Sequence, residues 1–283
     1  MELPHAERCA LPGKGTLVII GGHEDKEDSR EILKEVARLS GGGKLVIATV
    51  ASHTREGYFE SYQKGFEGLD VSELVELYLD ERSDASKTSA LDKLQGATGV
   101  LFSGGDQLRI TSLIADTPVE KCLREIYLEG GVIAGTSAGA SMMCETMLVK
   151  GRSEETYRVG ELQMAPGLGL IRGVIIDQHF AERGRMGRLL GAVAQNPRVL
   201  GIGIDEDTAI VVRGDCFTVI GSGGVYVADG SGVTHSNVAE ARTGETLSIH
   251  DVRLHVLAAG DTYDLRAREP GLPAAKEAEE QRQ

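Results

Sequence analysis

Ser137 lies in the sequence Gly135-Thr-Ser-Ala-Gly139, which has the G-x-S-x-G spacing of a nucleophile elbow. The apolar run 132–134 precedes it, and residues 140–143, which favour a helix, follow it. A serine at such a strand–turn–helix junction has a strained backbone, and the flanking glycines let strand and helix pass without a side-chain clash. The pattern therefore predicts a nucleophile. The alternative is a tight turn in which Ser137 only caps a helix.

A hydroxyl nucleophile needs a base, and the base needs a carboxylate that orients it. After the elbow, His179 is the histidine that stands directly beyond an apolar strand, 174–176. Two carboxylates compete for the third position. Glu206 follows the strand expected at 199–204, and Glu155 lies in a polar stretch soon after the elbow helix. We favour Glu206, because the ends of parallel strands converge on one edge of a sheet, and keep Glu155 as the alternative.

An acyl-transfer site also needs donors for a developing oxyanion. The N–H of Ala138, at the start of the elbow helix, can supply one donor. Residues 103–107, Ser-Gly-Gly-Asp-Gln, follow a short apolar strand, and the bare backbone at Gly105 can supply the second. The alternative for this segment is a glycine turn that leads into the next helix.

Three arginines, Arg183, Arg185 and Arg188, stand within six positions just after His179, in a chain whose net charge is −13. They predict a wall that binds carboxylates, because a guanidinium matches a carboxylate bidentately. A solvated helix face is the alternative reading of the same cluster.

The composition excludes several classes of function. A strongly acidic chain argues against a general nucleic-acid or anionic-membrane surface. There is no phosphate-binding loop, the pair Gly21-Gly22 completes no G-x-G-x-x-G, and no H-E-x-x-H is present, so we expect neither cofactor nor metal. The four cysteines form no C-x-x-C pair, and no signal-like apolar segment is recognisable, which together predict a cytoplasmic protein.

The expected elements alternate between strands and helices up to the elbow and become strand-rich after residue 173. This order predicts an α/β fold, with a doubly wound, mostly parallel sheet flanked by helices and antiparallel hairpins near the C-terminus. We expect an N-terminal arm at 1–14, one domain at 15–268 and a disordered tail at 269–283. The expected strands are 16–20, 44–50, 72–79, 99–102, 132–134, 174–176, 199–204, 208–212, 217–220, 224–227 and 252–257.

With these residues assembled, the chain resembles the cyanophycinases, which belong to a serine peptidase family that also contains the aspartyl dipeptidases. The resemblance covers about residues 15 to 265, and the block 177–188 is its specific part; His23 stands where a small residue is expected. The matching stretches are Gly21-Gly-His-Glu-Asp-Lys26, Phe102-Ser-Gly-Gly-Asp-Gln107, Gly135-Thr-Ser-Ala-Gly-Ala-Ser141, Asp177-Gln-His-Phe180, Arg183-Gly-Arg-Met-Gly-Arg188 and Gly203-Ile-Asp-Glu206.

The resemblance implies a sheet similar to that of class I glutamine amidotransferases and a homodimer without a cofactor. It implies an exopeptidase that cuts cyanophycin, a polyaspartate with arginine joined to each β-carboxyl, into β-aspartyl-arginine dipeptides. Ser137, His179 and Glu206 would be nucleophile, base and orienting acid. The alternatives are a dipeptidase of the same family, an α/β-hydrolase esterase or acyltransferase, and a non-catalytic binding homologue. The implied substrate-pocket residues are Gln107, Asp177, Gln178, Arg183, Arg185 and Arg188.

Overall fold

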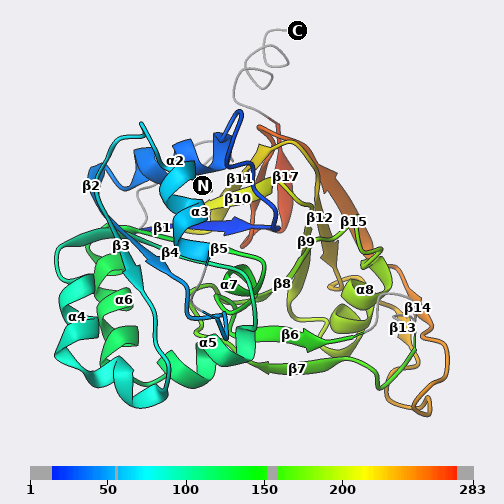
Figure 1. Cartoon of the computed structure of the whole chain (residues 1–283). Coiled ribbons are helices and arrows are strands. Elements are labelled where there is room, and N and C mark those ends of the chain that lie inside the picture. The colour runs from blue at the N-terminus through cyan, green and yellow to red at the C-terminus, as the bar shows by residue number, and fades with distance from the viewer. Residues whose placement is uncertain (1–14, 55–56, 152–157, 273–283) are drawn as a thin grey trace, which may run out of the picture.

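The computed structural model describes residues 15–54, 57–151 and 158–272. In these residues, five neighbouring strands of a central nine-stranded sheet run parallel to one another (Figure 1). All five coincide with strands predicted from the sequence. From the edge inward they are β3 (Val71–Leu77), β2 (Gly42–Ala48), β4 (Ala97–Phe102), β5 (Val132–Thr136) and β1 (Thr16–Ile20).

Helices bury both faces of these parallel strands. Successive side chains of a strand point to opposite faces, so Ile20 packs in one apolar cluster with Leu33, while Ile19 packs in another with Leu123. This arrangement explains why the strands are continuously apolar. It confirms the mixed α/β class with helices on a parallel sheet. The helices before the elbow are α2 (Glu31–Leu39), α3 (Tyr58–Gly65), the 3-10 helix η1 (Arg82–Ser86), α4 (Thr88–Leu94), α5 (Gln107–Ile114) and α6 (Pro118–Leu128).

Antiparallel strands extend the central sheet beyond β1. They are β10 (Thr208–Arg213), β11 (Cys216–Gly221), β16 (Thr262–Asp264) and β17 (Glu269–Gly271). The expected tail beginning at residue 269 is therefore wrong at its start. Pairing with β16 supplies the backbone hydrogen bonds that a short, charged, proline-containing segment lacks on its own.

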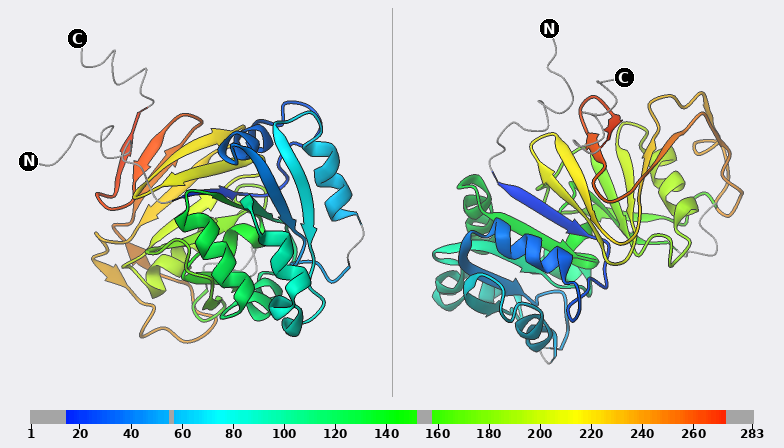
Figure 2. Two further views of the ribbon diagram at one scale, coloured as in Figure 1. Left: turned by 90° about the vertical axis from the view of Figure 1, so that its left-hand side faces the viewer. Right: turned by 90° about the horizontal axis from the view of Figure 1, so that it is seen from above.

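A second sheet of four strands lies beside the first, to the right of the parallel strands in Figure 1 and separate from them in the views of Figure 2. Its strands are β8 (Val174–Gln178), β9 (Leu200–Ile204), β12 (Val225–Asp229) and β15 (Arg253–Leu257), and α8 (Met186–Gln195) packs on it. The expectation that His179, Glu206 and Ser137 follow strands of one parallel sheet is wrong, because β8 and β9 pair in parallel with each other and not with β5.

Two short ribbons complete the described strands. One joins β6 (Thr146–Lys150) to β7 (Gln163–Pro166), and the other joins β13 (His235–Ser236) to β14 (Ile249–His250). No helix within residues 15–54, 57–151 and 158–272 is long and apolar enough to cross a membrane.

The pairing of β17 with β16 predicts that removing β17 destabilises the protein. A chain ending at Arg268 should melt below a chain ending at Leu272, since it loses the ladder hydrogen bonds and uncovers the edge beside the buried Tyr263. With about 0.5–1.5 kcal/mol for each hydrogen bond, we expect a loss of about 1–3 kcal/mol. Thermal unfolding followed by circular dichroism measures it, and equal melting temperatures would show that β17 adds nothing to the sheet.

Candidate active site

Ser137 lies between β5 and the one-turn helix α7 (Ala138–Ser141), as the elbow pattern predicts. Its backbone has φ 54° and ψ −111°, a conformation that is costly for a residue with a side chain. A Cβ at Gly135 would lie 2.3 Å from the carbonyl oxygen of Gly139, so this turn needs glycine. The Ser137 hydroxyl makes no capping hydrogen bond to α7, which contradicts the alternative reading of a helix cap.

The Ser137 hydroxyl is instead within hydrogen-bond distance of His179. Its Oγ lies 2.9 Å from His179 Nε2, and His179 Nδ1 lies 2.7 Å from Glu206 Oε1. His179 and Glu206 follow the neighbouring parallel strands β8 and β9, which explains how residues distant in sequence meet. Glu155 lies outside the described residues. In this arrangement, the imidazole can remove the proton from the serine hydroxyl, and the carboxylate can stabilise the resulting imidazolium.

Three consecutive residues, the last of β1 and the two that follow it, hold these segments together across the two sheets. The carbonyl of Ile20 accepts the N–H of Ser137 at 3.1 Å, that of Gly21 accepts the N–H of His179 at 2.8 Å, and that of Gly22 accepts the N–H of Asp207 at 2.8 Å. Gly22 has φ 113°, and a Cβ there would lie 2.2 Å from His179 Cε1. Gly22, in the pair that completes no phosphate-binding motif, therefore lets the backbone contact the imidazole.

The environment of His179 favours its neutral form. Burial lowers the pKa of the imidazole below its ordinary value, and the positive charges of Arg183 and Arg185 lower this pKa further. The hydrogen bond with Glu206 and its charge act in the opposite direction, but the net direction is down. A neutral imidazole at neutral pH is the form that can accept the serine proton.

The predicted oxyanion donors are the N–H groups of Gly105 and Ala138. Ala138 directly follows the serine in sequence, and the loop that carries Gly105 lies close to it. Gly104 and Gly105, in the loop between β4 and α5, and Ser137 line the same cavity of about 750 Å³. A Cβ on Gly104 would lie 3.4 Å from Ser137 Cβ, which shows how closely this loop approaches the serine. Among the described residues, the N–H groups of Gly105 and Ala138 donate to no backbone acceptor, as oxyanion donors require.

Of the expected pocket residues, Gln107, Gln178 and the three arginines line this cavity, whereas Asp177 does not. The Asp177 carboxylate is fully buried and forms ion pairs at 3.0 Å with Arg185 Nη1 and Arg188 Nε. These two arginines are buried as well, and burial lowers the pKa of Arg185 to about 10, so it stays charged at neutral pH. Arg183 differs from them, because it is exposed and has no ion pair with a described residue.

The two glutamines are each held by one end. Gln107 Nε2 donates to the carbonyl oxygen of Leu148 at 2.9 Å, which leaves its side-chain oxygen available as an acceptor. Gln178 Oε1 accepts the hydroxyl of Ser141 at 3.0 Å, which leaves its Nε2 available as a donor. The cavity wall thus offers both kinds of polar group in fixed orientations.

The structure adds a buried carboxylate that the sequence analysis did not single out. Glu24 accepts hydrogen bonds from Tyr62 Oη at 2.7 Å and from Thr136 Oγ1 at 2.6 Å, and pairs with Lys26 Nζ at 2.7 Å. Burial alone would raise the pKa of Glu24, but Lys26 and these hydrogen bonds lower it below its ordinary value. Because Thr136 immediately precedes Ser137, Glu24 ties the elbow to α3. The signal for it in the sequence is the polar stretch at residues 23–28, which directly follows the first strand and its two glycines.

Known proteins with similar sequences share most of this chain. Residues 17–220 match the model of Peptidase family S51. A cyanophycinase of Trichormus variabilis is 40% identical over 273 residues, 95% of this chain and 89% of that protein. Those of Synechococcus elongatus and Geminocystis herdmanii are 38% and 37% identical over 260 and 261 residues, which span 90% and 91% of this chain and 81% and 96% of the relatives.

Solved structures show the same fold. A peptidase from an acI-B1 Actinobacterium superposes with a TM-score of 0.65 at 24% identity, over 88% of this chain and 96% of that one. The family match covers the elbow, the histidine and Glu206, and the relatives extend over nearly the whole chain. The chain therefore belongs to Peptidase family S51.

Proposed function

We propose that the protein is a serine-type exopeptidase that hydrolyses cyanophycin to β-aspartyl-arginine dipeptides through an acyl-enzyme. The observation that carries the proposal is the Ser137–His179–Glu206 chain of contacts at 2.9 and 2.7 Å, whose serine and histidine line a polar cavity. Relatives 37–40% identical over most of the chain are cyanophycinases, which supports this choice of substrate.

In the proposed mechanism, Ser137 Oγ attacks the scissile carbonyl carbon while His179 Nε2 takes its proton. The carbonyl oxygen becomes an oxyanion and accepts hydrogen bonds from the N–H groups of Gly105 and Ala138. His179 then gives the proton to the leaving amine, and the bond to that amine breaks. A water molecule, deprotonated by the same imidazole, hydrolyses the acyl-enzyme and regenerates the serine. Glu206 keeps Nδ1 protonated and stabilises the imidazolium in both halves of the reaction.

We assign substrate recognition to the groups that are uncommitted in the cavity. Arg183 is the exposed guanidinium, so it can pair with a free carboxylate of the substrate. The amide donor of Gln178 can support that carboxylate, and the side-chain oxygen of Gln107 can accept from the substrate guanidinium. In this assignment, Asp177, Arg185 and Arg188 shape the cavity wall through their buried ion pairs. Because these charges are paired within the protein, they are not fully available to the substrate. The homodimer and the cytoplasmic location stay predictions.

The direct test is incubation with purified cyanophycin, with products followed by mass spectrometry and Ser137→Ala as the matched control. We expect β-aspartyl-arginine from the parent and loss of at least about 10⁴-fold in kcat from the variant, because a triad acts as a unit. Activity on soluble isoaspartyl or aspartyl dipeptides alone would favour the dipeptidase alternative. Binding of the polymer without turnover would identify a non-catalytic homologue.

The lowered pKa of His179 predicts that the acid limb of the pH–rate profile lies at unusually low pH. Only neutral His179 accepts the serine proton, so kcat/KM should be full above the lowered pKa and fall as the pH drops through it, below the ordinary 6.5. Glu206→Gln should reduce kcat and move the limb to still lower pH, because Glu206 raises the pKa of His179. The pH–rate profiles of both proteins measure this. A limb at or above 6.5 in the parent would contradict the assignment.

Arg183 and Arg188 provide a matched pair for separating recognition from stability. Arg183→Ala removes an exposed, uncommitted charge, so KM for the polymer should rise about 10–100-fold, which corresponds to a charged hydrogen bond of about 1.5–3 kcal/mol, with little change in melting temperature. Arg188→Ala removes a buried partner of Asp177, so the melting temperature should fall by several degrees. Kinetics and thermal unfolding of both variants decide this. Equal losses of stability would make Arg183 a structural residue.

A further inference from the structure

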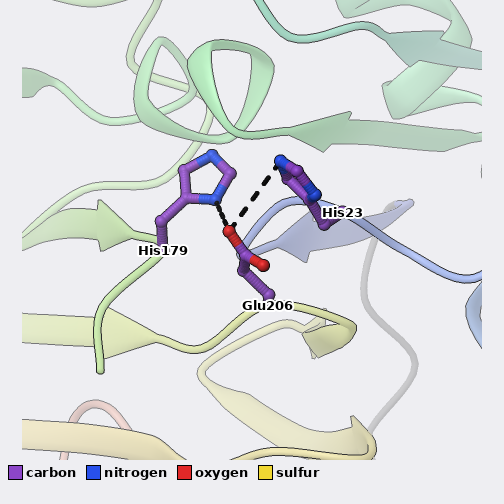
Figure 3. Close-up of side chains that lie close together, drawn as sticks. All are labelled: His23, His179 and Glu206. Atoms are coloured by element: carbon purple, nitrogen blue, oxygen red, sulfur yellow. Dashed lines mark hydrogen bonds and ion pairs between the residues drawn. The ribbon is translucent and has the colours of Figure 1, made fainter. Parts of the chain in front are cut away.

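We propose that His23, His179 and Glu206 form an inhibitory binding site for a divalent cation of the Zn²⁺ type. The three side chains gather beside the catalytic serine, and Figure 3 shows both imidazoles directed at the Glu206 carboxylate. Binding of the cation stands on these residues alone, whereas its effect on turnover rests on the proposed peptidase function.

The donor atoms lie close to the spacing that a tetrahedral ion needs. Glu206 Oε1 lies 2.7 Å from His179 Nδ1 and 3.8 Å from His23 Nε2, and one donor atom from each residue lies within 4.8 Å of the others. Zinc bonds of about 2.0–2.2 Å in tetrahedral geometry place ligand atoms roughly 3.3 Å apart. The observed separations lie on both sides of that value. Rotation of the exposed His23 and a small shift of the partly exposed Glu206 carboxylate therefore complete the site, with water in the fourth position.

His23 is free to make that adjustment. Its side chain is 69% exposed and lies edge-on to His179, with ring centroids 5.2 Å apart. Within the described residues, its one polar side-chain contact is the long ion pair with Glu206. Its backbone has φ 49°, a left-handed conformation that glycine adopts at lower cost.

The cation and the catalytic hydrogen bond compete for the same nitrogen. In the active arrangement, His179 Nδ1–H donates to Glu206 and Nε2 accepts from Ser137. A cation that binds Nδ1 takes its lone pair, and the neutral ring keeps its one proton at Nε2. That nitrogen then donates to Ser137 Oγ and can no longer accept the serine proton. The metal-bound enzyme should therefore turn over no substrate, although its substrate cavity stays open.

The test measures ZnCl₂ binding and inhibition on EDTA-treated, dialysed protein. Titration calorimetry should show one tight site in the parent, weakened in His23→Gln by more than the ~10–100-fold that loss of an outer-shell partner costs. ZnCl₂ should lower kcat of the parent. His23→Gln should resist at the same concentration, with each rate normalised to that protein's own metal-free rate.

The matched control is His250→Gln, because His235 and His250 lie with ring centroids 4.8 Å apart and offer a competing surface pair. This variant should bind zinc and be inhibited like the parent. Zinc binding that survives in His23→Gln, or that disappears in His250→Gln instead, would overturn the site. Tight binding without inhibition of an active parent would overturn the inhibitory role. A parent without peptidase activity would refute the proposed function, and calorimetry would still decide the site.

Discussion

The close passage of residues 20–22 between the two sheets is the constraint on which the site depends. Three successive carbonyls accept the N–H groups of Ser137, His179 and Asp207, so one short segment sets the relative positions of the three segments that carry the proposed triad. The distance of 2.2 Å between a Cβ at Gly22 and the imidazole shows that this works only with a bare backbone. Any side chain there would push His179 away from Ser137, and a displacement of about 1 Å is enough to impair acyl transfer severely.

Burial separates the charged residues that stabilise the structure from the one that is free to bind substrate. Asp177 is removed from water together with Arg185 and Arg188, and such a cluster is stable only because every charge has a partner. The pairs leave Arg183 as the exposed member of the three arginines. A cavity in a chain of net charge −13 thereby presents a positive group beside its serine. This local reversal suits a substrate that carries free carboxylates.

The sequence predicted the parallel strands and the elbow, because continuous apolar runs and the G-x-S-x-G spacing are local signals. It did not predict that His179 and Glu206 follow strands of a second sheet, since an apolar run such as 174–176 carries no information about which strand it pairs with. Nor did it distinguish Asp177 from Arg183 in the pocket, because burial depends on tertiary packing. Residues 269–271 looked like a tail for the same reason: their pairing partner is supplied by the fold.

The same geometry that suits His179 to the proposed role of base also exposes the site to a competing ligand. An orienting carboxylate must bond Nδ1, and Glu206 does so while its side chain remains 29% exposed. A carboxylate and an imidazole nitrogen at 2.7 Å are already two donors of a zinc site, and a third exposed donor beside them completes it. A small residue at position 23 would supply no third donor and would leave the site incomplete. In this chain His23 lies 3.8 Å from Glu206, so metal sensitivity follows from the choice of one side chain at the rim of the triad and not from any change in the triad itself.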